Sequence, residues 1–589
     1  MKKEWKEVFS HYLDRRDFLG SASKALLALA AFPLIGSAAR AATPMGPTIT
    51  STGSGPRTLL TNGLVVDGTG KQGYIGSVLV SGDTIMDVVP GTPDAGNAAV
   101  IDCTGKVIAP GFIDAHSHMD WYLPVAGHEE LKTPFSAQGI TTFVAGNCGY
   151  GAAGYRKGVD RDSLVYLGGA KDYFTIEWDS MEDYFARVKR VGMTHNLVNF
   201  VGHGTTRASM RGFDPSALSD VETSEMLGLL GDAMDQGAYG VSFGLQYEPG
   251  LFAATDEIER ICRLVKEKDK VVTVHSKAYS TLSGTYPLNP LGAPHNLIAL
   301  KEMLDAARKT GVKLQLSHLI FVGSLTWKNC DTALSMIEDA IADGVDVKFD
   351  TYSYHCGVSH INVFFPPSFL ARAPEVYDDK AALRGIKLQF SFIVNVMGFG
   401  FDDIQITYAN DEELNRYNGM FLSEIARARG MDNFTNFFDI ARRSGGVARV
   451  LNHRYSNPEI VQTLMRHPSS LFMTDAWVEK TGVQNPAAFG CFPRFLEWAR
   501  DKQLITLEEA VRKMTGATAE RFDIKGRGFL KRGNAADITV FDPDTVKDNN
   551  TLAETANAPS GIEMVFINGR RVVKDGKVDP KVKAGVVVG

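Results

Sequence analysis

Two histidines separated by one residue, His116 and His118, end the apolar segment 111–115. On a β-strand, side chains at positions i and i+2 lie on the same face, so both imidazoles can point at one ion. The pair alone is weak evidence, because chance often produces His-x-His in a chain of 589 residues. Two histidines that cap an ordinary strand are the alternative, so a metal site needs ligands from elsewhere in the chain.

Further residues of metal-ligand type end other strand-like runs: Cys148, His275, His318 and Asp475. Their sulfur, nitrogen and oxygen donors suit zinc. Each has a simpler interpretation when taken alone, because a lone cysteine is usually a small buried apolar residue and a lone aspartate often caps a helix. A buried histidine is often only a hydrogen-bonded core residue. Ligand types at the ends of so many strands favour a metal site.

The middle of the chain alternates strand-like and helical runs, which is typical of βα units with a parallel sheet. Such a series predicts an α/β fold, a TIM (β/α)8 barrel, whose active site lies at the carboxyl ends of the strands. A doubly wound sheet is the structural alternative. The strand-like runs are residues 111–118, 141–149, 196–204, 240–245, 271–275, 312–318, 345–354 and 471–475, with helical candidates at 224–236, 257–268 and 297–310.

Both ends of the chain contain short β-type runs around an Asn-Gly pair, a strong hairpin signal. We therefore expect a small β-sandwich built from both termini. The long segment between the seventh and eighth strands predicts an insertion, and we hypothesise that it is a lid that excludes water; a packing insertion or an oligomer contact is the alternative. The predicted parts are a linker at 42–56, the sandwich at 57–106 and 528–589, and the barrel at 107–527 with its insertion at about 357–469.

The amino terminus resembles an export signal. Arg15 and Arg16 precede an apolar, alanine-rich run at residues 25–35, and residues 39–41 have the small-x-small form of a cleavage site. Paired arginines at this place are typical of the twin-arginine route, which exports folded proteins. We expect residues 1–41 to be such a signal and the protein to be periplasmic or otherwise exported. An ordinary secretory signal and an uncleaved anchor are the alternatives.

The composition is that of an ordinary globular protein: 44% hydrophobic and 22% charged residues, with a formal net charge of −6. No basic excess points to nucleic acid, and no later apolar run is long enough to cross a membrane. Six cysteines are too few for a disulfide scaffold in a chain of this length, so a conspicuously placed cysteine is a candidate ligand. The sequence does not indicate an oligomeric state.

Several segments resemble a known family. Residues 107–118 are similar to the first-strand signature of the amidohydrolase superfamily. Later segments narrow the resemblance to the N-acyl-D-amino-acid deacylase (D-aminoacylase) branch, which has a cysteine at the second strand where many relatives have a carboxylated lysine. The resemblance runs from about residue 57 to the carboxyl terminus. Its later segments are residues 139–149, 202–207, 240–250, 317–318, 349–354 and 490–494.

The resemblance implies a zinc-dependent hydrolase that cleaves a C–N amide bond of a small molecule with activated water. Cys148, His275 and His318 would hold a tightly bound zinc. His116, His118 and Asp475 would form a second, weaker or vacant site, with Cys148 able to bridge. A thiolate and two imidazoles leave a fourth position for water, and zinc lowers the pKa of that water and polarises the carbonyl. Asp475 is the expected general base.

The substrate contacts depart from the family pattern. Ile320 and Ala487 stand where the family carries a lysine and an arginine that hold a substrate carboxylate. We expect Lys277 to stand in for them, Tyr354 to contact substrate, and His203 to orient substrate or water. Tyr354 as a packing aromatic, and His203 as a partner of a carbonyl, are the alternatives.

The missing cations suit an uncharged or cyclic amide, a lactam, an ester or a larger apolar amide better than a small N-acyl amino acid. A non-catalytic zinc-binding or solute-binding periplasmic protein is a further alternative. Such a protein would not need Asp475, so the presence of this residue argues against it.

Overall fold

The computed structural model describes residues 55–589, except 160–172, 288, 290, 480, 481, 552 and 553. The predicted signal at 1–41, and the predicted linker up to residue 54, lie outside the described residues. A helix long and apolar enough to cross a membrane is absent from the described residues.

The barrel consists of a six-stranded and a three-stranded parallel sheet joined edge to edge. Phe200 separates β8 from β9 within one strand position, and its N–H donates to the Ala145 carbonyl at 2.8 Å. The barrel closes where the Ala115 N–H donates to the Phe472 carbonyl at 3.2 Å. The nine strands thus fill eight positions, which confirms the predicted TIM barrel. They are β6 (Phe112–Asp114), β7 (Ile140–Ala145), β8 (Asn196–Asn199), β9 (Val201–Gly202), β10 (Gly240–Gly244), β11 (Val271–His275), β12 (Lys313–Leu316), β13 (Val347–Thr351) and β17 (Ser470–Phe472).

Caps define some ends of the helices between the strands. A capping box between Ser219 and Glu222 starts α6, and Gly311 ends α8 in the left-handed conformation. The capping box explains why α6 starts at Asp220, four residues before the predicted helix. The helices packed around the barrel include α4 (Met181–Val191), α5 (His203–Arg211), α6 (Asp220–Asp235), α7 (Thr255–Glu267), α8 (His295–Thr310), α10 (Cys330–Ala342), α16 (Ala487–Lys502) and α17 (Leu507–Met514).

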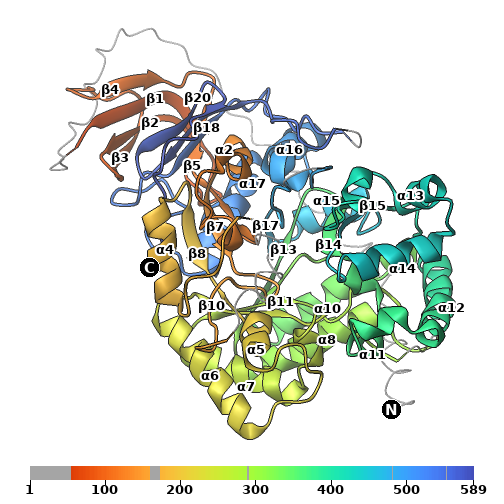
Figure 1. Ribbon diagram of the computed structural model, residues 1–589. Helices are drawn as coiled ribbons and strands as arrows, with labels where there is room; N and C mark the ends of the chain where they lie inside the picture. Colours follow the sequence, from red (N-terminus) through yellow and green to blue (C-terminus); the bar gives the residue numbers. More distant parts are fainter. Residues whose placement is uncertain (1–54, 160–172, 288, 290, 480–481, 552–553) are drawn as a thin grey trace, which may run out of the picture. The chain divides into compact units, whose positions relative to one another are not determined.

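Strands from both ends of the described chain form one nine-stranded sheet (Figure 1). The two ends meet where β5 pairs antiparallel with β18. The sheet folds over a shared core that includes Leu60, Val78, Ile538 and Phe566. The barrel segment was predicted to begin at residue 107, but β5 pairs in this sheet and the first barrel strand begins at Phe112. The strands are β1 (Arg57–Val65), β2 (Tyr74–Ser81), β3 (Thr84–Pro90), β4 (Ala99–Asp102), β5 (Val107–Pro110), β18 (Ile538–Phe541), β19 (Ile562–Ile567), β20 (Arg570–Lys574) and β21 (Lys577–Val578).

The insertion after β13 has a core of its own, in which the rings of Phe365, Phe390 and Phe437 stack. Its three strands pair antiparallel in the order β14-β16-β15, and its helices lie together in Figure 1. Helix α15 (Pro458–Arg466) packs on β13 and β17, so the barrel resumes there. Lid movement of the insertion stays a prediction. The elements are β14 (Gly357–His360), α11 (Pro367–Leu370), α12 (Lys380–Met397), β15 (Ile404–Tyr408), α13 (Leu422–Arg429), α14 (Asn433–Arg443) and β16 (Arg449–Asn452).

Candidate metal centre and active site

The six predicted ligands converge at the carboxyl ends of the barrel strands. One group comprises His116, His118, Cys148 and Asp475, and another comprises Cys148, His275 and His318. Within each group, one ligand atom from every residue lies within 4.8 Å of the others. Cys148 belongs to both groups, which is the arrangement that the family resemblance implied.

Distances within the two groups show how closely the ligand atoms approach. Cys148 Sγ lies 3.4 Å from Nε2 of His116 and 3.4 Å from Nε2 of His318. His275 Nδ1 lies 2.9 Å from His318 Nε2. Asp475 Oδ1 is 3.4 Å from His116 Nε2 and 3.3 Å from His118 Nε2. Nitrogen, sulfur and oxygen atoms are thus gathered around a space small enough for a metal ion.

The backbone is strained at three of the ligands. Cys148, His318 and Asp475 have φ angles of 54°, 31° and 48°, in the left-handed region that few non-glycine residues adopt. Such residues cost on the order of 1–3 kcal/mol each and cluster at functional sites. Each lies two or three residues after the end of a barrel strand, where the strain turns its side chain into the barrel mouth.

Glycines allow the Cys148 loop to approach the neighbouring strands. A Cβ at Gly146 would lie 2.3 Å from the Phe200 carbonyl oxygen, and a Cβ at Gly149 would lie 2.7 Å from the Gly244 nitrogen. Both positions also have positive φ angles. Only glycine fits at these two positions, which explains the Gly-x-x-Gly frame around the thiol.

Buried carboxylates behind the ligands hold them in place. Asp350 accepts hydrogen bonds from the His318 N–H at 2.6 Å and from Gln315 Nε2 at 2.8 Å, and its Oδ1 lies 3.5 Å from His116 Nδ1. Partners of this kind orient ligating imidazoles. Asp350 was not predicted as a site residue, although it lies at the end of the seventh strand beside the ligand-bearing ends.

Mutual electrostatic effects fix the charge of the metal-free site. Burial alone would lower the pKa of His118, but hydrogen bonds to Asp475 and Cys148 raise it to about 9. Burial opposes ionisation of Asp475, whereas the positive charges of His116 and His318 hold its pKa below the ordinary value. Protons on imidazoles therefore balance the acidic ligands of the metal-free protein.

The thiol and the fifth-strand histidine have the charge states that metal ligands need. Burial raises the pKa of a thiol, but the charges of His116 and His318 hold the pKa of Cys148 well below its ordinary value. Burial and the neighbouring His318 lower the pKa of His275 to about 4, so it is neutral at pH 7. A thiolate, imidazoles and a carboxylate together fit zinc or a similar divalent cation.

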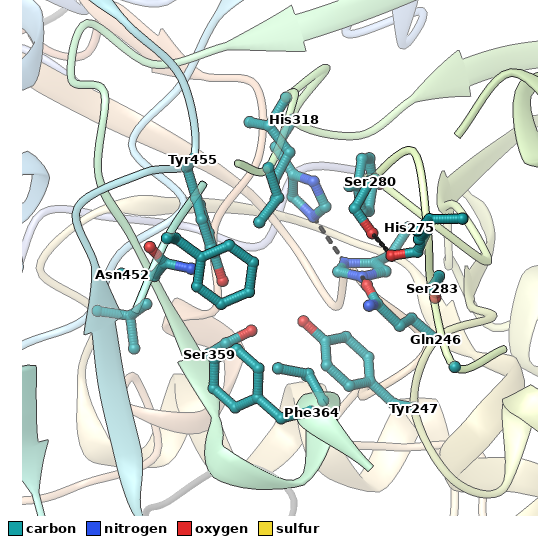
Figure 2. Close-up of a pocket in the computed structure, with 18 of the residues that line it drawn as sticks. Gln246, Tyr247, His275, Ser280, Ser283, His318, Ser359, Phe364, Asn452 and Tyr455 are labelled. Atoms are coloured by element: carbon teal, nitrogen blue, oxygen red, sulfur yellow. Dashed lines mark hydrogen bonds between the residues drawn. The ribbon is translucent and has the colours of Figure 1, made fainter. Parts of the chain in front are cut away.

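A cavity of about 790 Å³ opens beside the ligands (Figure 2). His275, His318 and Asp475 form part of its wall, together with hydroxyl groups and apolar side chains. Part of the apolar wall comes from the insertion, so the insertion helps to build the site. Other lining residues include Tyr247, Tyr279, Leu282, Ile320, Val322, Ser359, Phe364, Phe390, Phe399 and Tyr455.

A smaller cavity of about 540 Å³ lies beside the same ligands. It shares His318 and Asp475 with the larger cavity, so the two meet at the metal site. Its wall includes one guanidinium group. Its other lining residues include His118, Trp121, Cys148, Tyr150, His360, Arg449 and Trp477.

The structure places the five residues predicted to contact substrate at different sites. Ile320 lines the larger cavity. Ala487, expected beside the substrate, is buried as the first residue of α16, and its carbonyl lies 3.4 Å from Gln138 Nε2. Tyr354 lines neither cavity, because its hydroxyl donates to Asp548 at 2.6 Å and its ring packs under Arg494. Tyr354 is thus packed against Asp548 and Arg494, and its role as a substrate contact stays a prediction.

Lys277 and His203 also lie outside the two cavities. The Lys277 ammonium lies 5.1 Å from the centre of the Tyr286 ring. His203 is buried, and its Nε2 lies 2.7 Å from a Glu257 oxygen. Both side chains have these partners outside the cavity walls, and their roles as substrate contacts stay predictions.

Other cavity residues were not predicted. Tyr247 lies three residues after the glycine that ends β10 but was noted only as part of a family segment. Ser359, Tyr455 and Arg449 lie on or near the insertion strands. Tyr247 could have been predicted from its place just after a barrel strand. The insertion residues do not follow barrel strands, so no such sequence signal marks them.

Comparisons with known proteins agree with this site. The model of the Amidohydrolase family matches residues 99–350 and 397–576. N-acyl-D-glutamate deacylase of Alcaligenes xylosoxydans xylosoxydans is 31% identical over 516 residues, which cover 87% of this chain and 92% of that protein. D-aminoacylase of the same organism is 29% identical over 515 residues, covering 87% and 94%.

A solved structure extends the likeness to three dimensions. N-acyl-D-glutamate deacylase from Bordetella bronchiseptica, solved with zinc and a phosphonate inhibitor that mimics the tetrahedral intermediate, superposes with a TM-score of 0.73 at 27% identity. The match covers 91% of this chain and 100% of that one. The fold, the convergent ligands and the matching family model lead to one conclusion: this chain belongs to the amidohydrolase family and is a metal-dependent hydrolase of C–N bonds other than peptide bonds.

Proposed function

We propose that this protein is a zinc-dependent deacylase-like enzyme that hydrolyses the amide bond of a small molecule. The observation that carries the proposal is the position of Asp475. Its carboxylate lies 3.4 Å or less from the imidazoles of His116 and His118 and also borders both cavities. An acidic group between metal ligands and substrate space is placed for proton transfer.

Cys148, His275 and His318 would hold the principal ion, and His116, His118 and Asp475 would form a second site. A bound zinc ion supplies Lewis acidity, which lowers the pKa of water and polarises a carbonyl group. Asp475 takes the proton of the attacking water and returns it to the leaving amine nitrogen. His116 and His118 orient the Asp475 carboxylate for both transfers.

The larger cavity favours an amide with a sizeable apolar group. Ile320, Val322, Phe364 and Phe399 line it, and such a wall binds hydrocarbon rather than charge. A second candidate is the hydrolysis of a neutral or cyclic amide, a lactam or an ester. This candidate is favoured by Ile320, which stands in the cavity wall at a position where the family carries a cation. A solute-binding protein without catalysis would have no use for Asp475.

The proposed reaction can be tested by assaying the metal-free protein on a panel of amides before and after zinc is added. The panel pairs N-acetyl and N-octanoyl derivatives of D- and L-amino acids with neutral amides and a lactam of similar size. We expect hydrolysis only after zinc addition, and faster hydrolysis of the octanoyl compounds. Equal rates before and after chelation, or no hydrolysis of any panel member, would contradict the proposal.

We also propose that the protein is exported in its folded state. Arg15 and Arg16 ahead of the apolar run at residues 25–35 support this proposal. Substituting both arginines with lysine is expected to retain the protein in the cytoplasm, as measured by cell fractionation. Unchanged export would point to an ordinary secretory signal.

A further inference from the structure

Arg449 brings a positive charge from the insertion to the active site. It is the first residue of β16, and it lies opposite His360 in the antiparallel pairing of β14 and β16. It lines the smaller cavity together with His118 and Asp475, although only 6% of its surface is exposed. A buried arginine at the wall of an active-site cavity raises the question of its partners, because charged residues are rarely buried unless they are paired.

Three contacts fix the guanidinium. Its Nε donates to Oε1 of Glu479, and its Nη2 donates to Oε2 at 2.6 Å. The Tyr408 ring lies beneath it, with 4.7 Å between Cζ and the ring centre. Trp477 Nε1 donates to the same Glu479 at 2.8 Å. The Arg449 side chain is therefore rigid, which lowers the entropy cost of binding a further group.

This arrangement leaves part of the guanidinium free. A guanidinium has five N–H donors, and the pairing with Glu479 uses those of Nε and one of Nη2. Within the described residues, the structure assigns no acceptor to Nη1. The edge formed by Nη1 and Nη2 has the fork geometry that matches the two oxygens of a carboxylate.

A purely structural role for Arg449 is the alternative. Another arginine of the insertion shows what such a role looks like: Arg443 pairs with Asp411 at 2.6 Å, is 24% exposed in its side chain, and lines neither cavity. Arg449 differs because its pair is buried and its free edge belongs to a residue of the cavity wall. Structural pairing accounts for the contact with Glu479 but not for the donors left without a partner.

The position of Arg449 complements the apolar wall of the larger cavity. Ile320 lines the larger cavity, where a cation would hold a carboxylate in the family, and Arg449 lines the smaller one. The two cavities meet at Asp475 and His318, so a substrate whose amide lies at the metal site extends into both. One part of such a substrate meets hydrocarbon and the other meets a guanidinium.

We propose that Arg449 is a specificity-determining residue that binds a carboxylate on the amine side of the substrate, while the apolar acyl group fills the larger cavity. This inference rests on the proposed amide hydrolysis and deepens it. The substrate class is an N-acyl amino acid with a sizeable acyl chain, and the carboxylate is held by the insertion rather than by the barrel.

Binding of probes that cannot be hydrolysed tests this assignment. In 4-oxodecanoic acid a ketone replaces the amide and a carboxylate follows it, whereas decan-4-one lacks the carboxylate. Calorimetric titration of the zinc-loaded protein is expected to show about 10-fold tighter binding of the acid, which is the scale of one charge-assisted contact. The paired substitution Arg449→Met with Glu479→Gln leaves no buried carboxylate unpaired. It is expected to bind both probes within about 2-fold of each other and to bind the ketone as the wild type does.

Two further variants complete the test. Arg449→Lys keeps the charge without the fork, and we expect it to lose most of the preference for the acid. Arg443→Met with Asp411→Asn is the matched control in the same insertion and should behave as the wild type does. Equal binding of the two probes by the wild type, no binding of the acid, or an undiminished preference in either Arg449 variant would overturn the assignment. A wild type that prefers the acid but hydrolyses no amide contradicts the proposed function alone.

Discussion

The Cys148 thiol lies 3.4 Å from Nε2 of His318, although the two residues follow different strands, β7 and β12. Strands β8, β9, β10 and β11 lie between these two in the barrel. Both residues have positive φ angles, so each backbone is turned to bring its side chain to the same point. Cys148 also reaches His116 at 3.4 Å, which makes it the residue common to both ligand groups. The thiol is therefore the centre of the site.

Removing this thiol should remove the metal. Cys148→Ala takes away the shared ligand and leaves imidazoles without the thiolate that favours soft cations. We expect zinc content, measured by plasma emission spectrometry after gel filtration, to fall below about one tenth of the wild-type value. Cys262→Ala, which changes a buried cysteine in α7, is the control and should keep its zinc.

The carboxylate behind the ligands should matter nearly as much as the ligands themselves. Asp350→Asn keeps the shape of the side chain but removes the negative charge 3.5 Å from His116 Nδ1. We expect zinc affinity to fall about 10- to 100-fold, the usual effect of losing a partner that orients a ligating histidine. Competition with a fluorescent chelator measures the change. An affinity within about 2-fold of the wild type would show that Asp350 only supports the strand ends.

Metal affinity should rise with pH. The pKa of His118 is raised from the ordinary value near 6.5 to about 9, so His118 carries a proton in the metal-free protein at pH 7. A cation that binds there displaces this proton, so apparent affinity at this group grows about 10-fold per pH unit up to pH 9 and then levels off. Chelator competition between pH 6 and pH 9.5 measures the slope. A flat profile would mean that His118 is neutral or takes no part in binding.

Aromatic residues of the insertion should set the preference for large acyl groups. Phe364 lines the larger cavity (Figure 2), so Phe364→Ala removes apolar surface that a long acyl chain would contact. We expect kcat/KM for an N-octanoyl substrate to fall about 10-fold, and that for the N-acetyl compound to change little. Equal losses for both chain lengths would place Phe364 in a structural role. Phe434→Ala, in the core of the same insertion, controls for a loss of stability.

Sequence periodicity predicted the barrel, and the residue types at the strand ends predicted the candidate ligands. Every predicted strand of the barrel is present, because each has the apolar run and the length that a buried parallel strand needs. His116, His118, Cys148, His275, His318 and Asp475 meet because strand ends of a closed barrel share one face. The meeting of strand ends on one face depends only on the order of strands and helices, and that order can be predicted from the sequence.

The substrate contacts could not be predicted in the same way. Tyr354 and His203 also follow barrel strands. The side chain of Tyr354 is held by Asp548, which is distant in the sequence. The side chain of His203 is held by Glu257, which belongs to helix α7. Arg449 reaches the site because β16 pairs with β14 across a long stretch of chain. Long-range pairing of this kind leaves no local pattern, so an insertion residue could not be recognised as part of the site.

Asp475→Asn is the decisive substitution for the proposed mechanism, because it changes the proposed general base while it keeps an oxygen near His116 and His118. We predict zinc content close to that of the wild type and a kcat that is about 10²- to 10⁴-fold lower on an N-acyl amino acid. Zinc content and kcat are to be measured on the same preparation. Full activity in zinc-loaded Asp475→Asn would contradict the account.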